Sequence, residues 1–489
     1  MGNSSVSEQD QASGSTFLGQ PAALANLFGV EMWERFSFYG MTAILIYYLY
    51  YPVTDGGLGI SQAAATSIVG AYGGTVYFST IIGAWVADRL LGSERTLFYS
   101  AVLVIIGHVA LATLPGLPGV GVGLVLVALG SGAVKANATS MVGELYGAGD
   151  NRRDAGYSIY YMGLNLGVLV GPLLTGLVND IAGFRIGFAL AALGMSVGLT
   201  QYVLYRGRLS GVSAEAANPL PRSDRLRYSA IALGVVVVVV AASVTHLLTA
   251  DNLSGVVIVV TVLAAFGYFT IFLSSRKVTA VERSRIVAFI PLFIVSAVFW
   301  SLFQQQFTVL AIYADQRLDR NVFGWEFPAA WVRSITPVFL IIFAGLFAAM
   351  WTRLGPRQPT APIKFAAGTA FTGLAFWAFL MFAGSGPNGA PLLGVVFICL
   401  LLTFGELLIA PVGLSLASKL APAAFHTQTV ALYYLSIALG TAAAGTLAQY
   451  YDVDNEVPYF ATVGSFSVGV GVITALISPW IIRRMRGVR

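Results

Sequence analysis

The sequence predicts an all-α membrane protein with fourteen spanning helices. Of its 489 residues, 57% are hydrophobic and only 10% are charged, whereas about a quarter of the residues of an ordinary soluble domain are charged. The 22 acids and 27 bases are too few to cover the surface of a soluble protein of this length. From about residue 21 onward, apolar stretches that reach the roughly 20 residues needed to cross a bilayer follow one another. These observations exclude most soluble enzyme folds.

The first residues, 1–20, are polar and lack the basic start and apolar core of a signal peptide. We expect them to form a disordered cytoplasmic tail, and residues 485–489 to form a second tail. The predicted spans between the tails are, in order, 21–52, 62–90, 94–115, 119–147, 153–181, 185–206, 226–247, 253–275, 283–314, 326–354, 361–383, 390–421, 425–450 and 458–484.

The loops between these spans alternate in charge. One set is basic, as at Arg152, Arg153 and residues 206–227, and the alternate set is acidic, as at Asp251 and Asp452. The positive-inside rule places the basic loops, and with them both termini, in the cytoplasm. We therefore expect a multi-pass protein of a plasma membrane or a bacterial inner membrane.

The longest polar break, residues 206–225, follows the sixth span. The next two spans, 226–247 and 253–275, are rich in Val, Ile and Ala, and we interpret them as lipid-facing inserts. Without them the spans number six plus six, the layout of transporters built from two repeated halves. The predicted domains are two six-helix bundles and the insert between them, at 21–206, 283–484 and 207–282.

Reactive and ligating side chains are scarce. Cys399 is the single cysteine, so an intrachain disulfide and a cysteine-based metal site are excluded. His108, His246 and His426 lie far apart in the sequence, which argues against a histidine-rich metal site. Nucleic acid is one explanation of the net charge of +5, but basic cytoplasmic loops explain it better in a membrane protein. We expect no metal site, no cofactor and no nucleic-acid partner.

Five charged residues lie well inside the predicted spans, where each charge costs roughly 2.5–3.5 kcal/mol on insertion scales. They are Glu31, Glu34, Arg35, Lys135 and Glu406. Offsets of three and four residues place the first three on one helical face. Two acids beside one base leave a carboxylate that can take up a proton, so these three are candidates for proton coupling. The alternative is a static ion cluster that fixes helix packing.

The other two charges lie in opposite halves of the chain. Lys135 has small neighbours in GSGAVKAN, which leave room around its ammonium and favour an anion site, for either a substrate carboxylate or the surplus glutamate of the first cluster. A lysine that snorkels to the membrane edge is the alternative. Glu406 precedes Pro411, which would bend the helix, and a protonated structural acid is its alternative. A lysine in one half and an acid in the other predict a cavity with two poles, suited to a zwitterion.

Six segments together resemble the proton-dependent oligopeptide transporter (POT or PTR) family of the major facilitator superfamily. They are EMWERFSFYG (31–40), GAWVADRLLGSERT (83–96), GSGAVKAN (130–137), SIYYMGLNLGVLVGP (158–172), WTRLGPRQPTAPIKFAAG (351–368) and FGELLIAPVGLSLASKLAP (404–422). The resemblance runs from about residue 21 to residue 450 and implies the major facilitator fold. Bacterial members have two extra helices between the halves, where the insert lies here.

By this resemblance the protein would import di- and tripeptides together with protons by alternating access, and it would not be an enzyme. Glu31 would accept the proton and release Arg35. Arg35 and Lys135 would attract the peptide carboxylate, and Glu406 with Asn165 would hold the ammonium. The other expected substrate-binding residues are Tyr39, Tyr77, Trp300, Gln304, Thr336, Ser415 and Tyr433. We expect a monomer in the bilayer.

Five positions depart from the common family pattern. Thr42 stands where members often have arginine, and Gln304 stands where they often have an acid. These two positions form an outer gate in the family, so a neutral gate held by hydrogen bonds and aromatic packing is expected here. Phe38 and Tyr433 replace a tyrosine and a tryptophan, and Thr336 replaces an asparagine. These substitutions leave the peptide preference open.

Other functions remain as alternatives. A family relative could move another small anion or zwitterion, and a superfamily antiporter could export drugs against protons. The E-x-x-E-R cluster, together with Lys135 and Glu406, favours peptides. An intramembrane enzyme would need a nucleophile–base pair or a metal cluster, and the scattered histidines and single cysteine supply neither. A receptor or a channel is not excluded by the sequence, although the surplus acid favours proton coupling.

Overall fold

The computed structural model describes residues 16–147, 150, 152–209 and 215–488. Residues 1–15 of the predicted tail at 1–20 therefore lie outside the described residues. Its last residues are ordered and not tail-like, because β1 (Thr16–Phe17) and β2 (Gln20–Pro21) pair as an antiparallel hairpin. Gly19 at the turn has a φ of 77°, a left-handed conformation that glycine adopts without strain. The Tyr146 hydroxyl anchors the hairpin by donating a hydrogen bond to Gln20 Oε1 at 3.1 Å.

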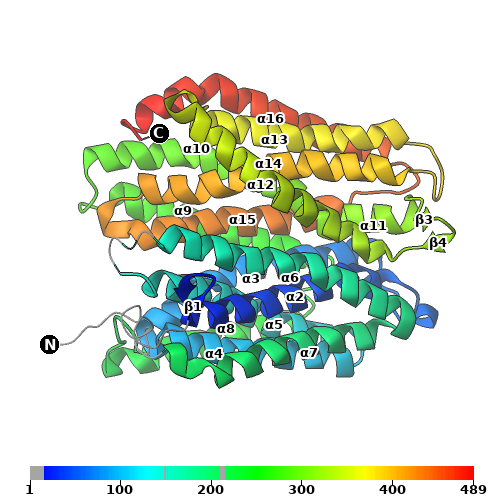
Figure 1. Ribbon diagram of the computed structural model, residues 1–489, viewed down its shortest axis with the longest axis horizontal. Coiled ribbons are helices and arrows are strands. Elements are labelled where there is room, and N and C mark those ends of the chain that lie inside the picture. Colours follow the sequence, from blue (N-terminus) through cyan, green and yellow to red (C-terminus); the bar gives the residue numbers. More distant parts are fainter. Residues whose placement is uncertain (1–15, 148–149, 151, 210–214, 489) are drawn as a thin grey trace. The chain divides into compact units, whose positions relative to one another are not determined.

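Helices account for nearly all of the remaining structure. The helices of eight or more residues are α2 (Ala23–Tyr50), α3 (Gln62–Val86), α4 (Ser93–Thr113), α5 (Gly116–Glu144), α6 (Arg153–Ala182), α7 (Phe184–Leu204), α8 (Arg222–Val244), α9 (Leu253–Ser274), α10 (Ala280–Phe303), α11 (Val309–Gln316), α12 (Ile335–Leu354), α13 (Ala361–Phe379), α14 (Leu392–Leu420), α15 (His426–Ala448) and α16 (Val457–Arg484) (Figure 1). A second hairpin joins β3 (Asn321–Val322) to β4 (Trp325–Glu326).

The predicted number of spans is confirmed. Within the described part of the chain, twelve helical segments are long and apolar enough to cross a membrane, with α10 and α11 forming one broken segment. α2 and α3 are 28 and 25 residues long and bring the total to fourteen. Helices are the expected solution because a bilayer core offers no water to the backbone, so each N–H and C=O group must bond within its own segment.

The ninth predicted span, 283–314, is predicted as one continuous helix but contains a break. α10 ends at Phe303, a 3₁₀ turn covers Gln304–Phe307, and α11 begins only at Val309. Thr308 between the two helices has φ −126° and ψ −88°, outside the helical region. The next span also starts irregularly, with a 3₁₀ segment at Ala329–Ser334 before α12.

The chain divides into two compact units, which we describe separately. The first unit covers the chain up to Gly59 together with Phe78–Ala250, and the second covers Ile60–Tyr77 and Asp251–Arg489. The bundles at 21–206 and 283–484 with their insert remain an interpretation of the sequence. In the structure, α8 belongs to the first unit and α9 to the second.

In the first unit, α2 packs against α6 and α7, and α4 packs against α5 and α7 (Figure 1). Glycines allow the closest approach, because a Cβ at Gly171 of α6 would lie 2.5 Å from the Phe36 carbonyl oxygen of α2. α8 differs from its neighbours, since none of its residues is buried. Tyr228 of α8 contacts Trp85 of α3, with the ring centroids 5.3 Å apart.

A short segment before α8 lies on the π-helical turn Ala87–Leu91, which connects α3 to α4. The backbone N–H groups of Asn218 and Leu220 donate to the carbonyl oxygens of Asp88 and Arg89 at 2.9 and 2.8 Å. The Asn218 side-chain amide also donates to Asp88 Oδ1 at 2.9 Å. This part of the polar insert is therefore fixed to the first unit.

In the second unit, α13 packs against α14 and α16, and α15 packs against α9 and α10 (Figure 1). The first part of α3 also packs here, because Gly70 and Gly445 of α15 meet so closely that a Cβ at Gly70 would lie 2.5 Å from the Gly445 Cα. A buried ion pair joins Arg317 Nη2 to Glu456 Oε1 at 2.8 Å. Arg317 directly follows α11, and Glu456 directly precedes α16.

Candidate functional site

The structure brings together the three charged residues that the sequence places on one face of α2. Arg35 Nε donates to Glu31 Oε1 at 2.7 Å and lies 3.1 Å from Glu34 Oε2. All three side chains are buried, with relative exposures of 4% for Arg35, 1% for Glu31 and 0% for Glu34. A buried carboxylate needs a charged or hydrogen-bonded partner, and here one guanidinium serves two carboxylates.

Lys135 of α5 completes this cluster. Its ammonium interacts electrostatically with Arg35 and with both glutamates. The charged residues of α2 alone are two acids and one base, which leaves one acid in surplus. When Lys135 is included, the cluster holds two acids and two bases, and its formal charge is zero. A ligand that attracts Lys135 or Arg35 would disturb this balance. Tyr160 of α6 is buried beside the cluster and interacts electrostatically with Glu31.

Three other predicted residues of the first unit lie on α2 and α6. Tyr39 is half-buried on α2 and interacts electrostatically with Arg35. Thr42 is buried, and its hydroxyl donates to the Phe38 carbonyl oxygen of its own helix at 2.9 Å. Asn165 of α6 likewise donates its amide to the Tyr161 carbonyl oxygen at 2.8 Å. Since the Asn165 N–H group is engaged in its own helix, its Oδ1 atom is the atom suited to accept a bond from an ammonium.

In the second unit, Glu406 is half-buried in the middle of α14. Arg333 is the charged side chain that interacts with it electrostatically. Arg333 is not among the predicted site residues, although it lies inside the predicted span 326–354. Its position seven residues from the start of that span, where a charge is costly, is the sequence signal that could have identified it. Arg333 is buried, and its guanidinium carbon lies 3.7 Å from the Phe307 ring centroid.

Three consecutive glutamines occupy the break between α10 and α11, and each binds a different helix or segment. Gln304 Nε2 donates to Thr441 Oγ1 of α15 at 3.2 Å. Gln305 Oε1 accepts from the Tyr459 hydroxyl of α16 at 2.6 Å. Gln306 Oε1 accepts from Arg333 Nη1 and from the Thr336 hydroxyl, both at 2.9 Å. The glutamines thus connect the broken segment to three neighbours, a role that the sequence analysis did not anticipate.

The remaining predicted residues of the second unit are spread over four helices. Trp300 is buried on α10 and makes an edge contact with Phe303 at 5.4 Å between ring centroids. Tyr433 is buried on α15, and its ring lies so close to α14 that a Cβ at Gly413 would be 2.5 Å from Cε2. Ser415 is exposed on α14, and Tyr77 is half-buried on α3.

Comparison with known proteins identifies the family. Residues 94–464 match a family model described as the POT family. The chain belongs to the POT family. An uncharacterized transporter of Bacillus subtilis (strain 168), YclF, is 41% identical over 480 residues, which cover 96% of both chains. A di-/tripeptide transporter of Lactococcus lactis subsp. cremoris is 38% identical, over 97% of this chain and 98% of the relative.

A solved structure agrees with the fold of this POT-family chain. A crystal structure of a mutant of the peptide transporter POT in complex with alafosfalin has a TM-score of 0.92 and 42% identity, covering 98% of this chain and 99% of that one. The predicted family and the major facilitator fold are therefore confirmed, and the protein is a multi-pass membrane transporter. The family model begins at residue 94, after the α2 cluster. The roles of the individual site residues remain predictions.

Proposed function

We propose that this POT-family transporter is a proton-coupled symporter that imports di- and tripeptides across a plasma membrane or bacterial inner membrane. Both termini would lie in the cytoplasm. Relatives of 38% and 34% identity are named a di-/tripeptide transporter and a peptide transporter. The structural observation that carries the proposal is the cluster of the buried residues Glu31, Glu34 and Arg35 with the half-buried Lys135, in which two acids face two bases.

The charge balance of this cluster links the peptide to the proton. A peptide carboxylate that approaches Lys135 and Arg35 competes with the two glutamates for the same cations. A buried carboxylate that loses its partner is strongly unfavourable. Protonation of Glu31 removes that cost, so peptide binding and proton uptake favour each other through one set of charges. Release of Arg35 by the protonated Glu31 would be the coupling step.

The peptide ammonium would bind Glu406, with Asn165 as a hydrogen-bond acceptor. Arg333 moderates the negative charge of Glu406, so the second unit would offer an ammonium a weaker attraction than a lone acid would. The carboxylate of Glu406 would still attract an ammonium and repel an anion. Its presence therefore supports a zwitterionic substrate more than a purely anionic one.

Uptake into proteoliposomes tests the proposal. Purified protein is reconstituted, and uptake of radiolabelled dialanine is measured with an inward proton gradient, with and without a protonophore. Symport predicts accumulation above the external concentration that the protonophore abolishes. Empty liposomes are the control. Absence of accumulation would refute peptide symport. Proton-linked transport of nitrate or of a cationic dye in the same proteoliposomes, without uptake of dialanine, would favour another substrate of the family or superfamily.

A further inference from the structure

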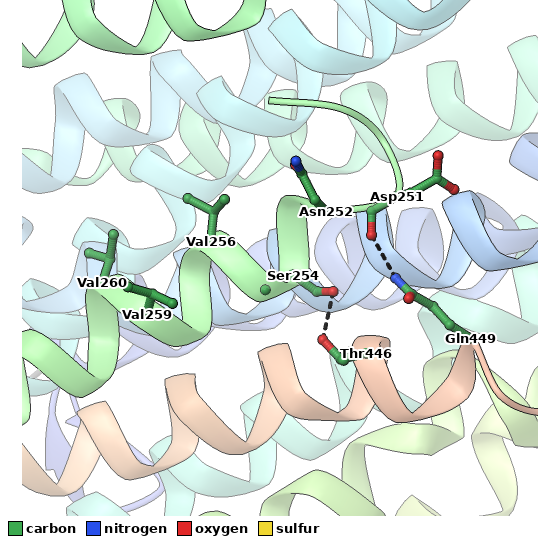
Figure 2. Close-up of a pocket in the computed structure, with 9 residues that line it drawn as sticks. Asp251, Asn252, Ser254, Val256, Val259, Val260, Thr446 and Gln449 are labelled. Atoms are coloured by element: carbon green, nitrogen blue, oxygen red, sulfur yellow. Dashed lines mark hydrogen bonds between the residues drawn. The ribbon is translucent and has the colours of Figure 1, made fainter. Parts of the chain in front are cut away.

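The second unit contains a hollow of about 430 Å³ at the start of α9 (Figure 2). Its volume lies within the range of roughly 300–1,000 Å³ that is typical of ligand sites. The described residues that line it come from the loop before α9, the first turns of α9 and the end of α15. They are Asp251, Asn252, Ser254, Gly255, Val256, Val259, Val260, Thr446 and Gln449.

One end of the hollow is polar, and Asp251 is the one charged residue among those that line it. Gln449 Nε2 donates to the Asp251 backbone oxygen at 2.8 Å and so fixes the loop, while the Asp251 carboxylate points away from this bond (Figure 2). That carboxylate forms no hydrogen bond or ion pair with another residue of the described chain. The side-chain amides of Asn252 and Gln449 add N–H donors at the same end.

The opposite end is apolar and open. Val256, Val259 and Val260 lie at offsets of three and four residues and share one face of α9 (Figure 2). Their relative exposures are 38%, 57% and 48%, so another molecule can reach them. At Gly255 a Cβ would meet no heavy atom within 4 Å, which shows that the space beside this turn is not filled by the protein.

The floor of the hollow is fixed by hydroxyl contacts within the second unit. Ser254 Oγ lies 2.8 Å from Thr446 Oγ1 of α15 and 3.2 Å from Ser67 Oγ of α3. Ser254 is fully buried. α9 is apolar enough to span the membrane, and Asp251 and Asn252 precede its first residue. The hollow therefore combines a polar end at the membrane surface with a valine wall that continues into the bilayer.

We propose that this hollow binds a membrane phospholipid whose headgroup carries an ammonium, as in phosphatidylethanolamine. The Asp251 carboxylate would pair with the ammonium, the amides of Asn252 and Gln449 would donate to the phosphodiester, and the valines would contact the first part of an acyl chain. An anionic headgroup such as that of phosphatidylglycerol would meet Asp251 without a compensating positive charge. The hollow holds the headgroup and the chain start, not a whole lipid.

Native mass spectrometry of the full-length protein tests the site. The protein is purified in mild detergent and incubated with equal amounts of phosphatidylethanolamine and phosphatidylglycerol, and the lipid retained is measured. The wild type should retain phosphatidylethanolamine preferentially. Asp251→Asn should reduce this preference by about two- to fivefold, the range of an exposed ion pair. Gly255→Phe should remove most of the retained lipid, because its ring would occupy the hollow.

Two variants are matched controls. Gly267→Phe adds the same ring to α9 at a second glycine whose Cβ would meet no heavy atom within 4 Å, outside the hollow. Asp454→Asn removes an exposed carboxylate of the second unit away from the hollow. Both should bind lipid as the wild type does. If Gly255→Phe fails to fold, Asp251→Asn and its control still decide the question.

Three results would overturn the proposal. The first is equal retention of the two lipids by the wild type. The second is equal lipid retention by Gly255→Phe and Gly267→Phe, or an equal preference for phosphatidylethanolamine in Asp251→Asn and Asp454→Asn. The third is a lipid-free dimer that Gly255→Phe dissociates, which would make a second copy of the chain the occupant. The readout is independent of transport, so it stands whether or not peptides are the substrate.

Discussion

Replacement of Glu31 by glutamine is the sharpest test of proton coupling. The change preserves the shape of the side chain and removes one negative charge from a cluster in which Arg35 Nε lies 2.7 Å from Glu31 Oε1. A charge-assisted hydrogen bond contributes about 1.5–3 kcal/mol, and Glu34 still holds the guanidinium at 3.1 Å. We therefore expect a folded protein whose cluster carries a net positive charge and can no longer take up the coupling proton.

The magnitude of the effect on transport follows from the gradient. One proton moving down a difference of one pH unit releases about 1.36 kcal/mol, which supports an accumulation of about tenfold per coupled proton. Wild-type proteoliposomes with an alkaline interior should approach this ratio for dialanine if one proton is coupled. The Glu31→Gln variant should only equilibrate the peptide, with a ratio near one. Exchange of internal for external peptide needs no net proton movement and should persist.

Glu144→Gln is a matched control, because Glu144 is an exposed acid at the end of α5 in the same unit. It should accumulate dialanine as the wild type does. Gradient-driven accumulation of normal size in Glu31→Gln would refute the coupling role. Loss of both accumulation and exchange, with an unchanged melting temperature, would instead assign Glu31 to peptide binding.

Three further predictions follow from the same geometry. N-acetyl-dialanine should compete at least tenfold more weakly than dialanine, since the acetyl group removes the ammonium proposed to bind Glu406 and an unpaired buried charge is costly; equal competition for uptake would show that the polarity assigned to the site is wrong. Gln304→Glu should destabilise the protein by about 1–3 kcal/mol, because it replaces the amide donor that binds the Thr441 hydroxyl in a buried position; an unchanged melting temperature would exclude this. Gly171→Leu should prevent close packing of α2 and α6 and lower the yield of folded protein. Gly121→Leu should not, because no heavy atom lies within 4 Å of the Cβ position at Gly121. Equal elution profiles of the two variants in size-exclusion chromatography would contradict the packing argument.

The sequence was most informative where the physical constraint is local. A spanning helix needs a long apolar stretch, so the fourteen spans were recoverable from composition alone. The Glu31–Glu34–Arg35 cluster was also recoverable, because offsets of three and four residues place side chains together in any helix. The pairing of Lys135 with this cluster was raised only as one of two options, since it depends on how α5 packs against α2.

Features set by contacts between distant segments were missed. The break at Gln304–Phe307 has no proline or glycine to mark it, and it depends on partners in α12, α15 and α16. Arg333 carries a signal in the sequence, a charge inside a predicted span, but its contacts with Gln306 and Phe307 depend on the 3₁₀ segment that replaces the expected helix start. The hairpin at the start of the described chain does not follow from the local sequence, because its anchor is Tyr146, more than a hundred residues away.

Because none of the residues of α8 is buried, substitutions in α8 are constrained less than substitutions in the packed helices. Selection on α8 acts through its solubility in hydrocarbon and not through the fit of individual side chains, so residues such as Val235 and Val240, 58% and 54% exposed, are interchangeable with Leu or Ile. We expect homologous sequences to diverge faster along α8 than along α2 while keeping the same hydrophobic length. A fluorophore attached at Val238 would accordingly report the viscosity of the surrounding lipid while leaving the core of the transporter unperturbed.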